Sequence, residues 1–104
     1  MAEHFIVVID GPEPGERIRL GRDPVVIGRK APSTWLFDSD PLVSRMHCRL
    51  SLVGDEVMLA DLNSTNGTYM NGSLVIGTTP WPPGSKVEVG NHVLEHQALT
   101  APDK

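Results

Sequence analysis

The sequence predicts an all-β domain, a β-sandwich of two packed sheets built from about nine to eleven short strands with ligand-binding loops at one end. Ten glycines and nine prolines divide the 104 residues into many short segments, and only 39% of the residues are apolar. No run long enough for a helix repeats its apolar positions at helical spacing. A chain of this length has room for one core, so we expect a single domain over residues 1–104, with its core in 4–99.

The first strands are predicted from short apolar or alternating runs that turn residues bound. Residues 5–9 are rich in β-branched side chains, and residues 16–20 alternate charged and apolar side chains, as a half-buried strand does. Short strands are expected at 25–28 and 35–37. The segment between these two contains Pro32 and is expected to be a loop.

A hairpin is the clearest strand signal in the middle of the chain. Residues 47–53 alternate apolar and polar side chains, and residues 56–62 can return after a turn at Gly54. Cys48 lies on the apolar face of the first strand and is expected to be a small buried side chain. It is the sole cysteine, so the chain can form no internal disulfide.

Two Asn-Gly pairs, at 66–67 and 71–72, follow this hairpin, and each favours the positive backbone torsions of a tight hairpin turn. A short strand is then expected at 73–76, followed by a Pro-rich loop at 77–84 around Trp81. We expect Trp81 to pack in the core or against a loop, and Trp35 likewise.

The chain is expected to end in a second hairpin, with strands at 86–89 and 92–99 joined across Gly90 and Asn91. Residues 100–104 have the composition of a frayed tail or the start of a linker. We therefore hypothesise that the chain is the amino-terminal piece of a longer protein.

Charge and hydropathy limit the classes of partner. The formal net charge of −4 argues against nonspecific binding to nucleic acid, which needs a basic surface, so any anion site must be local. The apolar run at 5–9 is too short for an export signal or a membrane span. We therefore expect a cytoplasmic protein with no membrane and no nucleic-acid partner, and the sequence indicates no cofactor.

Three polar clusters lie beside predicted strands and together offer what a phosphate group needs. Arg29 and Arg45 supply positive charge with fork-shaped donors, and Ser44, Thr65 and Asn66 supply neutral groups on turns. Loops at one end of a rigid sandwich are a usual place for such a set.

The order of the motifs resembles that of the forkhead-associated (FHA) domain, a module that binds phosphothreonine. The resemblance covers nearly the whole chain and rests on four motifs in the family's order, namely Gly28-Arg29, Ser44-Arg45-Met46-His47, Asn66-Gly67 and Asn71-Gly72. It implies phosphorylation-dependent binding of a partner protein, in signalling. Two departures are Ser85, where the family often has an acidic residue, and a longer loop at 77–84.

The resemblance also implies a role for each matching residue. Arg29 and Ser44 would bind the phosphate, and Arg45 would add positive charge beside it. Thr65 would contact the phosphothreonine, with its methyl group in a small cavity, and Asn66 would bond the ligand backbone just after it. Gly28, His47 and Gly67 match the family's structural positions, with His47 bracing the loop that holds Ser44.

The same residues also allow other interpretations. Arg29 could be a solvated turn residue, and the hydroxyls of Ser44 and Thr65 could be local caps. A hydrolytic triad of Ser44, His47 and Asp61 lacks a nucleophile elbow, so we expect no enzyme. The four histidines and one cysteine are scattered, so we expect no metal site. The alternative from another class is a phosphate-independent scaffold or oligomerisation domain of a larger assembly.

Overall fold

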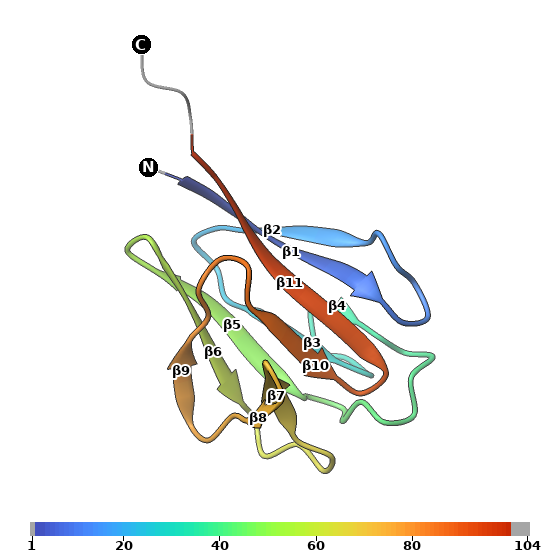
Figure 1. Cartoon of the computed structure of the whole chain (residues 1–104). Coiled ribbons are helices and arrows are strands. Elements are labelled where there is room, and N and C mark those ends of the chain that lie inside the picture. Colours follow the sequence, from blue (N-terminus) through green and yellow to red (C-terminus); the bar gives the residue numbers. More distant parts are fainter. Residues whose placement is uncertain (1, 101–104) are drawn as a thin grey trace.

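The computed structural model describes residues 2–100, which form two packed β-sheets (Figure 1). The strands of this part of the chain are β1 Ala2–Asp10, β2 Arg17–Leu20, β3 Val25–Gly28, β4 Trp35–Leu36, β5 Cys48–Val53, β6 Glu56–Asp61, β7 Thr68–Met70, β8 Ser73–Leu74, β9 Thr78–Pro80, β10 Lys86–Val89 and β11 His92–Thr100. The six-stranded sheet has the order β2-β1-β11-β10-β7-β8, and the five-stranded sheet has the order β4-β3-β5-β6-β9. The predicted all-β sandwich is confirmed. Residues 2–100 include no helix that is long and apolar enough to cross a membrane.

The two longest strands, β1 and β11, are neighbours in the larger sheet. They pair antiparallel from Ala2 opposite Thr100 to Asp10 opposite Val93, with an irregularity between Val8 and Asp10. The prediction that Thr100 begins a tail is wrong, because it pairs as the last residue of β11. The rest of the predicted tail, 101–104, lies outside the described residues.

The middle hairpin has the predicted register. β5 and β6 pair antiparallel from Cys48 opposite Asp61 to Val53 opposite Glu56, so the turn falls at residues 54 and 55. Cys48 is fully buried, as expected. Burial raises the pKa of its thiol, which therefore stays protonated and unreactive.

Sequence reasoning missed β9, which lies inside the predicted Pro-rich loop. Pro80 pairs opposite Met58 of β6, and Thr78 pairs opposite Ala60. β9 is the outermost strand of the five-stranded sheet. An edge strand makes ladder bonds on one side only, so it tolerates a proline without a backbone N–H.

The two Asn-Gly pairs have different conformations. Asn71 and Gly72 both have positive φ, 49° and 87°, and close the hairpin between β7 and β8 as predicted. The prediction of a hairpin turn at 66–67 is wrong, because β6 and β7 belong to different sheets. In this crossing segment the positive φ values belong to Asn63 (60°) and Gly67 (83°).

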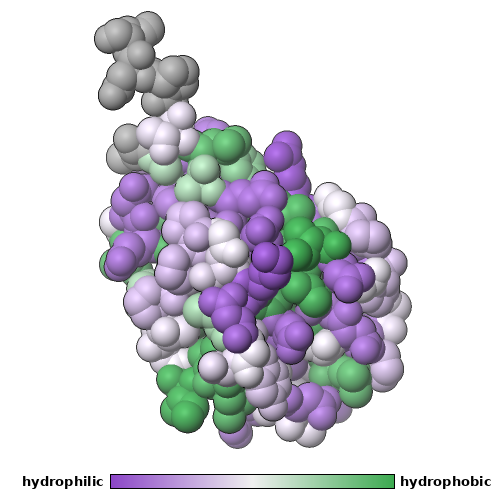
Figure 2. Space-filling model, in the orientation of Figure 1, coloured by the Kyte–Doolittle hydropathy of each residue, from purple (hydrophilic) through white to green (hydrophobic). Residues whose placement is uncertain are grey.

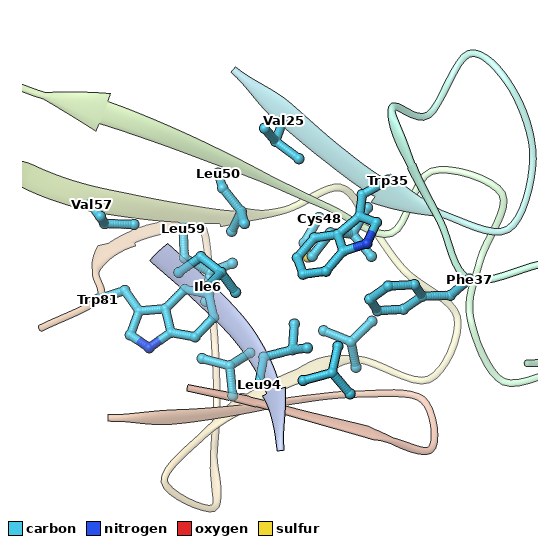
Figure 3. Close-up of a cluster of buried hydrophobic side chains, with 14 of the residues drawn as sticks. Ile6, Val25, Trp35, Phe37, Cys48, Leu50, Val57, Leu59, Trp81 and Leu94 are labelled. Carbon is cyan, nitrogen blue, oxygen red and sulfur yellow. The ribbon is translucent and has the colours of Figure 1, made fainter. Parts of the chain in front are cut away.

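The core lies between the sheets and is built from the inward residues of both (Figure 3). Ile6 and Leu94 of the larger sheet face Leu50 and Leu59 of the smaller one. Trp35 and Trp81 are both buried, as expected, at different sides of this cluster.

Outside the core, hydrophobic residues are exposed as separate patches between polar ones on the face in Figure 2. The large hydrophobic side chains that are exposed are Ile9, Leu36, Leu42, Met46, Val53, Leu74, Ile76 and Leu99.

The loops that carry the polar clusters lie at one end of the sandwich. The loop between β4 and β5 and the segment between β6 and β7 both lie at the lower right in Figure 1, whereas β1 begins and β11 ends at the upper left. The candidate site therefore lies at the opposite end of the sandwich from the start of β1 and the end of β11.

The core predicts how stability responds to truncation along β5. Leu50 is fully buried, whereas Val53, at the end of the same strand, is 62% exposed. Leu50→Ala should lower the free energy of unfolding by about 2 to 5 kcal/mol, because it leaves a cavity. Val53→Ala is the matched control and should change the stability by only about 0.5 kcal/mol. Urea unfolding followed by Trp fluorescence measures both, and equal losses would contradict this core assignment.

Candidate functional site

The first part of the site is a close backbone crossing at the end of β3. The backbone N–H of Arg29 donates to the carbonyls of Ser44, at 3.0 Å, and of Arg45, at 3.1 Å. A Cβ atom on Gly28 would collide with the Arg45 carbonyl oxygen and with Ser33 Oγ. Ser33 Oγ donates to that same carbonyl at 2.7 Å. Glycine at position 28 is therefore required for this approach, which explains why Gly28 precedes the arginine.

The Arg29 side chain is held by one edge of its guanidinium. Its Nε donates to the carbonyl of Val43 at 2.9 Å, and the side chain is part-buried. Within residues 2–100 neither Nη group has an ion-pair or hydrogen-bond partner. The two Nη groups are therefore available as paired donors for an anion.

His47 ties two loops together through both ring nitrogens. Its Nδ1 accepts the backbone N–H of Ser44 at 3.0 Å, so Nε2 carries the proton and donates to the Gly67 carbonyl at 3.0 Å. Burial lowers the pKa of His47, and the Gly67 bond and nearby carboxylates only partly oppose this. The geometry agrees with the bracing role that the resemblance implies.

Ser44 contacts the segment between β6 and β7 directly. Its Oγ accepts the backbone N–H of Thr65 at 3.0 Å. Accepting this bond leaves the hydroxyl hydrogen of Ser44 free to donate to another group. The side chain of Thr65 is exposed at the same place.

Asn66 is fixed by its amide nitrogen. Nδ2 donates to the carbonyl of Leu42 at 3.0 Å, so the Oδ1 atom is left as an acceptor on an exposed side chain. The neighbouring Arg45 side chain is exposed too and has no ion pair within residues 2–100. The structure thus brings Arg29, Ser44, Thr65 and Asn66 together through direct contacts between their loops.

Sequence reasoning missed the structural role of Asp61, which it considered only for a triad. Its carboxylate accepts the N–H of Ser64 at 3.1 Å, Ser64 Oγ at 2.5 Å and Thr68 Oγ1 at 2.7 Å. Burial by itself would raise the pKa of Asp61, but these bonds outweigh it and hold the pKa below its usual value. An Asp three residues before a Ser is a turn signal that could have indicated this role.

The contacts exclude the hydrolytic triad. Both ring nitrogens of His47 bond to backbone groups, and the Asp61 carboxylate is occupied by Ser64 and Thr68. Neither His47 nor Asp61 is therefore placed as a base for Ser44 Oγ. Among residues 2–100, no group of three or more His, Cys, Asp and Glu side chains could hold a metal ion.

Comparison with known proteins points to one family. Residues 25–90 match the family model described as FHA domain. FhaB, an FHA domain-containing protein of Mycobacterium tuberculosis, is 39% identical over 90% of this chain and 60% of its own length. Glycogen accumulation regulator GarA of Mycolicibacterium smegmatis is 35% identical over 86% of this chain and 56% of its own. The chain thus spans little more than half the length of these curated relatives.

A solved structure gives the same result in three dimensions. It comes from a structural and functional analysis of phosphothreonine-dependent FHA domain interactions, and it superposes with a TM-score of 0.82 at 28% sequence identity. The match covers 97% of this chain and 99% of the other. The similarity therefore extends beyond the residues that the family model matches.

The His47 brace predicts a distinctive titration. Because burial favours the neutral ring, the pKa of His47 should lie below its ordinary value of 6.5. The unfolded chain then binds this proton more readily, so the contribution of His47 to stability falls as the pH drops through 6.5. Two-dimensional NMR of the ring should show the Nε2–H tautomer and a midpoint below 6.5. A Nδ1–H tautomer, or a midpoint at or above 6.5, would contradict the brace.

Proposed function

The chain belongs to the FHA domain family, a family of phosphopeptide-binding modules, and we propose that Arg29, Ser44, Arg45, Thr65 and Asn66 bind a phosphothreonine of a partner protein. The observation that carries the proposal is the guanidinium of Arg29. One edge is fixed to the Val43 carbonyl at 2.9 Å, and its two Nη groups are free to form paired bonds with phosphate oxygens.

The neutral groups complete the proposed pocket. The Ser44 hydroxyl, oriented by the N–H of Thr65, would donate to a second phosphate oxygen. Thr65 would contact the phosphothreonine, with the ligand's methyl group in a small cavity. Asn66 Oδ1 would accept the backbone N–H of the residue that follows. Arg45 would add positive charge to a site in a chain whose net charge is −4.

The proposed mechanism is docking without chemistry. The site groups are held by backbone contacts before a ligand arrives, so little conformational entropy is lost on binding. Because His47 and Asp61 are engaged with other groups and do not activate Ser44, we propose that the chain is not an enzyme. This fits its relatives, which include a regulator of glycogen accumulation and an oxoglutarate dehydrogenase inhibitor.

Three further predictions from the sequence belong to this proposal. They are that residues 1–104 act as one domain, that they form part of a longer protein, and that the protein is cytoplasmic. The second is supported by the greater length of the curated relatives. The alternative function, a phosphate-independent scaffold, would bind phosphorylated and unphosphorylated partners equally.

Loss of the Arg29 guanidinium should weaken phosphothreonine binding at least about tenfold, because a charge-assisted hydrogen bond is worth about 1.5 to 3 kcal/mol. The test peptide would be selected by screening a library of peptides centred on phosphothreonine. Titration calorimetry would then compare its affinity for the parent with its affinity for Arg29→Ala. Undiminished affinity of Arg29→Ala would show that the pocket assignment is wrong.

Arg19→Ala is a matched control, because it removes the same charge from an exposed side chain on β2 in the larger sheet. It should bind like the parent. The unphosphorylated peptide is the second control, and equal binding of both peptides would favour the scaffold instead.

A further inference from the structure

Asp40 is a fully buried carboxylate in the loop between β4 and β5. Oδ1 accepts the N–H of Leu42 at 3.0 Å and the Nδ2 of Asn91 at 2.9 Å. Oδ2 accepts the N–H of Asn91 at 2.7 Å and Nδ1 of His92 at 2.8 Å. Three of the four donors belong to the turn and strand that follow β10, so Asp40 connects its loop to the larger sheet.

This arrangement suits a carboxylate better than an amide. Each oxygen accepts two donors, so an asparagine would point its amide hydrogens at the N–H of Leu42 and the amide of Asn91 in one orientation, and at the backbone N–H of Asn91 in the other. Burial by itself would raise the pKa of Asp40, but the bonds from Asn91, Leu42 and His92 outweigh it and lower the pKa, so the group is ionised at neutral pH.

The surroundings of Asp40 leave little freedom to shift. A Cβ atom on Gly90 would lie 2.7 Å from Asp40 Oδ2, so the β10–β11 turn packs directly against the carboxylate. The His92 ring stacks on Phe37, with centroids 4.0 Å apart and planes inclined by 19°. The loop is thus held at Phe37 and at Asp40 by the same residue of β11.

The segment that Asp40 anchors carries the two carbonyls that orient the proposed pocket. The Leu42 carbonyl accepts Asn66 Nδ2 at 3.0 Å, and the Val43 carbonyl accepts Arg29 Nε at 2.9 Å. Asp40 bonds the N–H of Leu42, and its own carbonyl accepts the N–H of Val43 at 3.1 Å. Asp40 therefore bonds both residues whose carbonyls hold Arg29 and Asn66, Leu42 through its carboxylate and Val43 through its main-chain carbonyl.

We infer that Asp40 is a positioning residue for phosphothreonine binding, which sets Arg29 and Asn66 through the carbonyls of Val43 and Leu42 and which couples the β10–β11 turn to the pocket. The inference rests on the proposed function. Asp40 is fully buried and its carboxylate bonds only protein donors, so it would act on the site through the loop and not by contact with the phosphate. It would determine where the side chains of Arg29 and Asn66 lie.

Titration calorimetry with the phosphothreonine peptide used for Arg29 tests the role. Asp40→Asn should bind at least about tenfold more weakly, as is usual when a side chain that orients binding groups is removed. Asn66→Ala removes one of the groups that Asp40 orients. The double variant should therefore lose less than the product of the two single losses.

Two further variants separate positioning from folding. His96→Gln changes an equally buried histidine whose side chain bonds His4 at 2.9 Å and the Trp81 carbonyl at 2.6 Å. Within residues 2–100 its side chain has no hydrogen bond to the loop between β4 and β5 or to the segment between β6 and β7. It should lower the melting temperature and leave the affinity unchanged. If Asp40→Asn does not fold, Asn91→Ala tests the positioning role instead, because Asn91 is exposed. This substitution removes the Nδ2 donor to Asp40 and should weaken binding roughly threefold.

The outcomes distinguish the positioning role of Asp40 from the proposed binding of phosphothreonine. The positioning role of Asp40 would be overturned if Asp40→Asn bound the peptide as tightly as the parent while Arg29→Ala still lost binding. If Asp40→Asn is unfolded, the same result for Asn91→Ala would overturn it. Strict multiplication of the Asp40 and Asn66 losses would also overturn it. Absence of phosphopeptide binding by the parent would overturn the proposed function and, with it, this inference.

Discussion

The close crossing of Gly28 over the Arg45 carbonyl is the contact on which the rest of the site depends. Because position 28 has no side chain, the end of β3 approaches the loop closely enough for the N–H of Arg29 to bond two successive carbonyls. That approach brings the Arg29 side chain over Val43 and the hydroxyl of Ser44 within reach of Thr65. A methyl group at position 28 would separate these segments, since it would collide with the backbone carbonyl of Arg45 and with Ser33 Oγ.

The segments that carry the candidate site, which follow β3, β4 and β6, are fixed to both sheets of the sandwich. Arg29 continues β3 of the smaller sheet, whereas Asp40 bonds to residues at the start of β11 in the larger one. The segment between β6 and β7 crosses from one sheet to the other and is held by His47 and Asp61. Relative movement of the sheets would therefore displace the candidate site, so the packed core between them contributes directly to the rigidity of that site.

Local patterns predicted most elements well, and the errors have physical causes. The middle hairpin and the turn at Asn71 were found because their signals lie within a few neighbouring residues. β9 was missed because Pro80 disfavours a strand, and only its place at the edge of a sheet makes it tolerable. The turn at Asn66 was wrong because a hairpin requires both flanking strands in one sheet, which is a property of the topology.

The sequence by itself determined the fold class, the order of the motifs and the residue types of the candidate pocket, because these depend on local periodicity, turn chemistry and side-chain identity. Only the tertiary structure decided which backbone groups hold those side chains. Asp40 illustrates the difference, since it looks like an ordinary loop carboxylate along the chain. Its role comes from donors that face it in space, among them residues 51 and 52 positions away. Such partners are set by the packing of the two sheets, which no local pattern encodes.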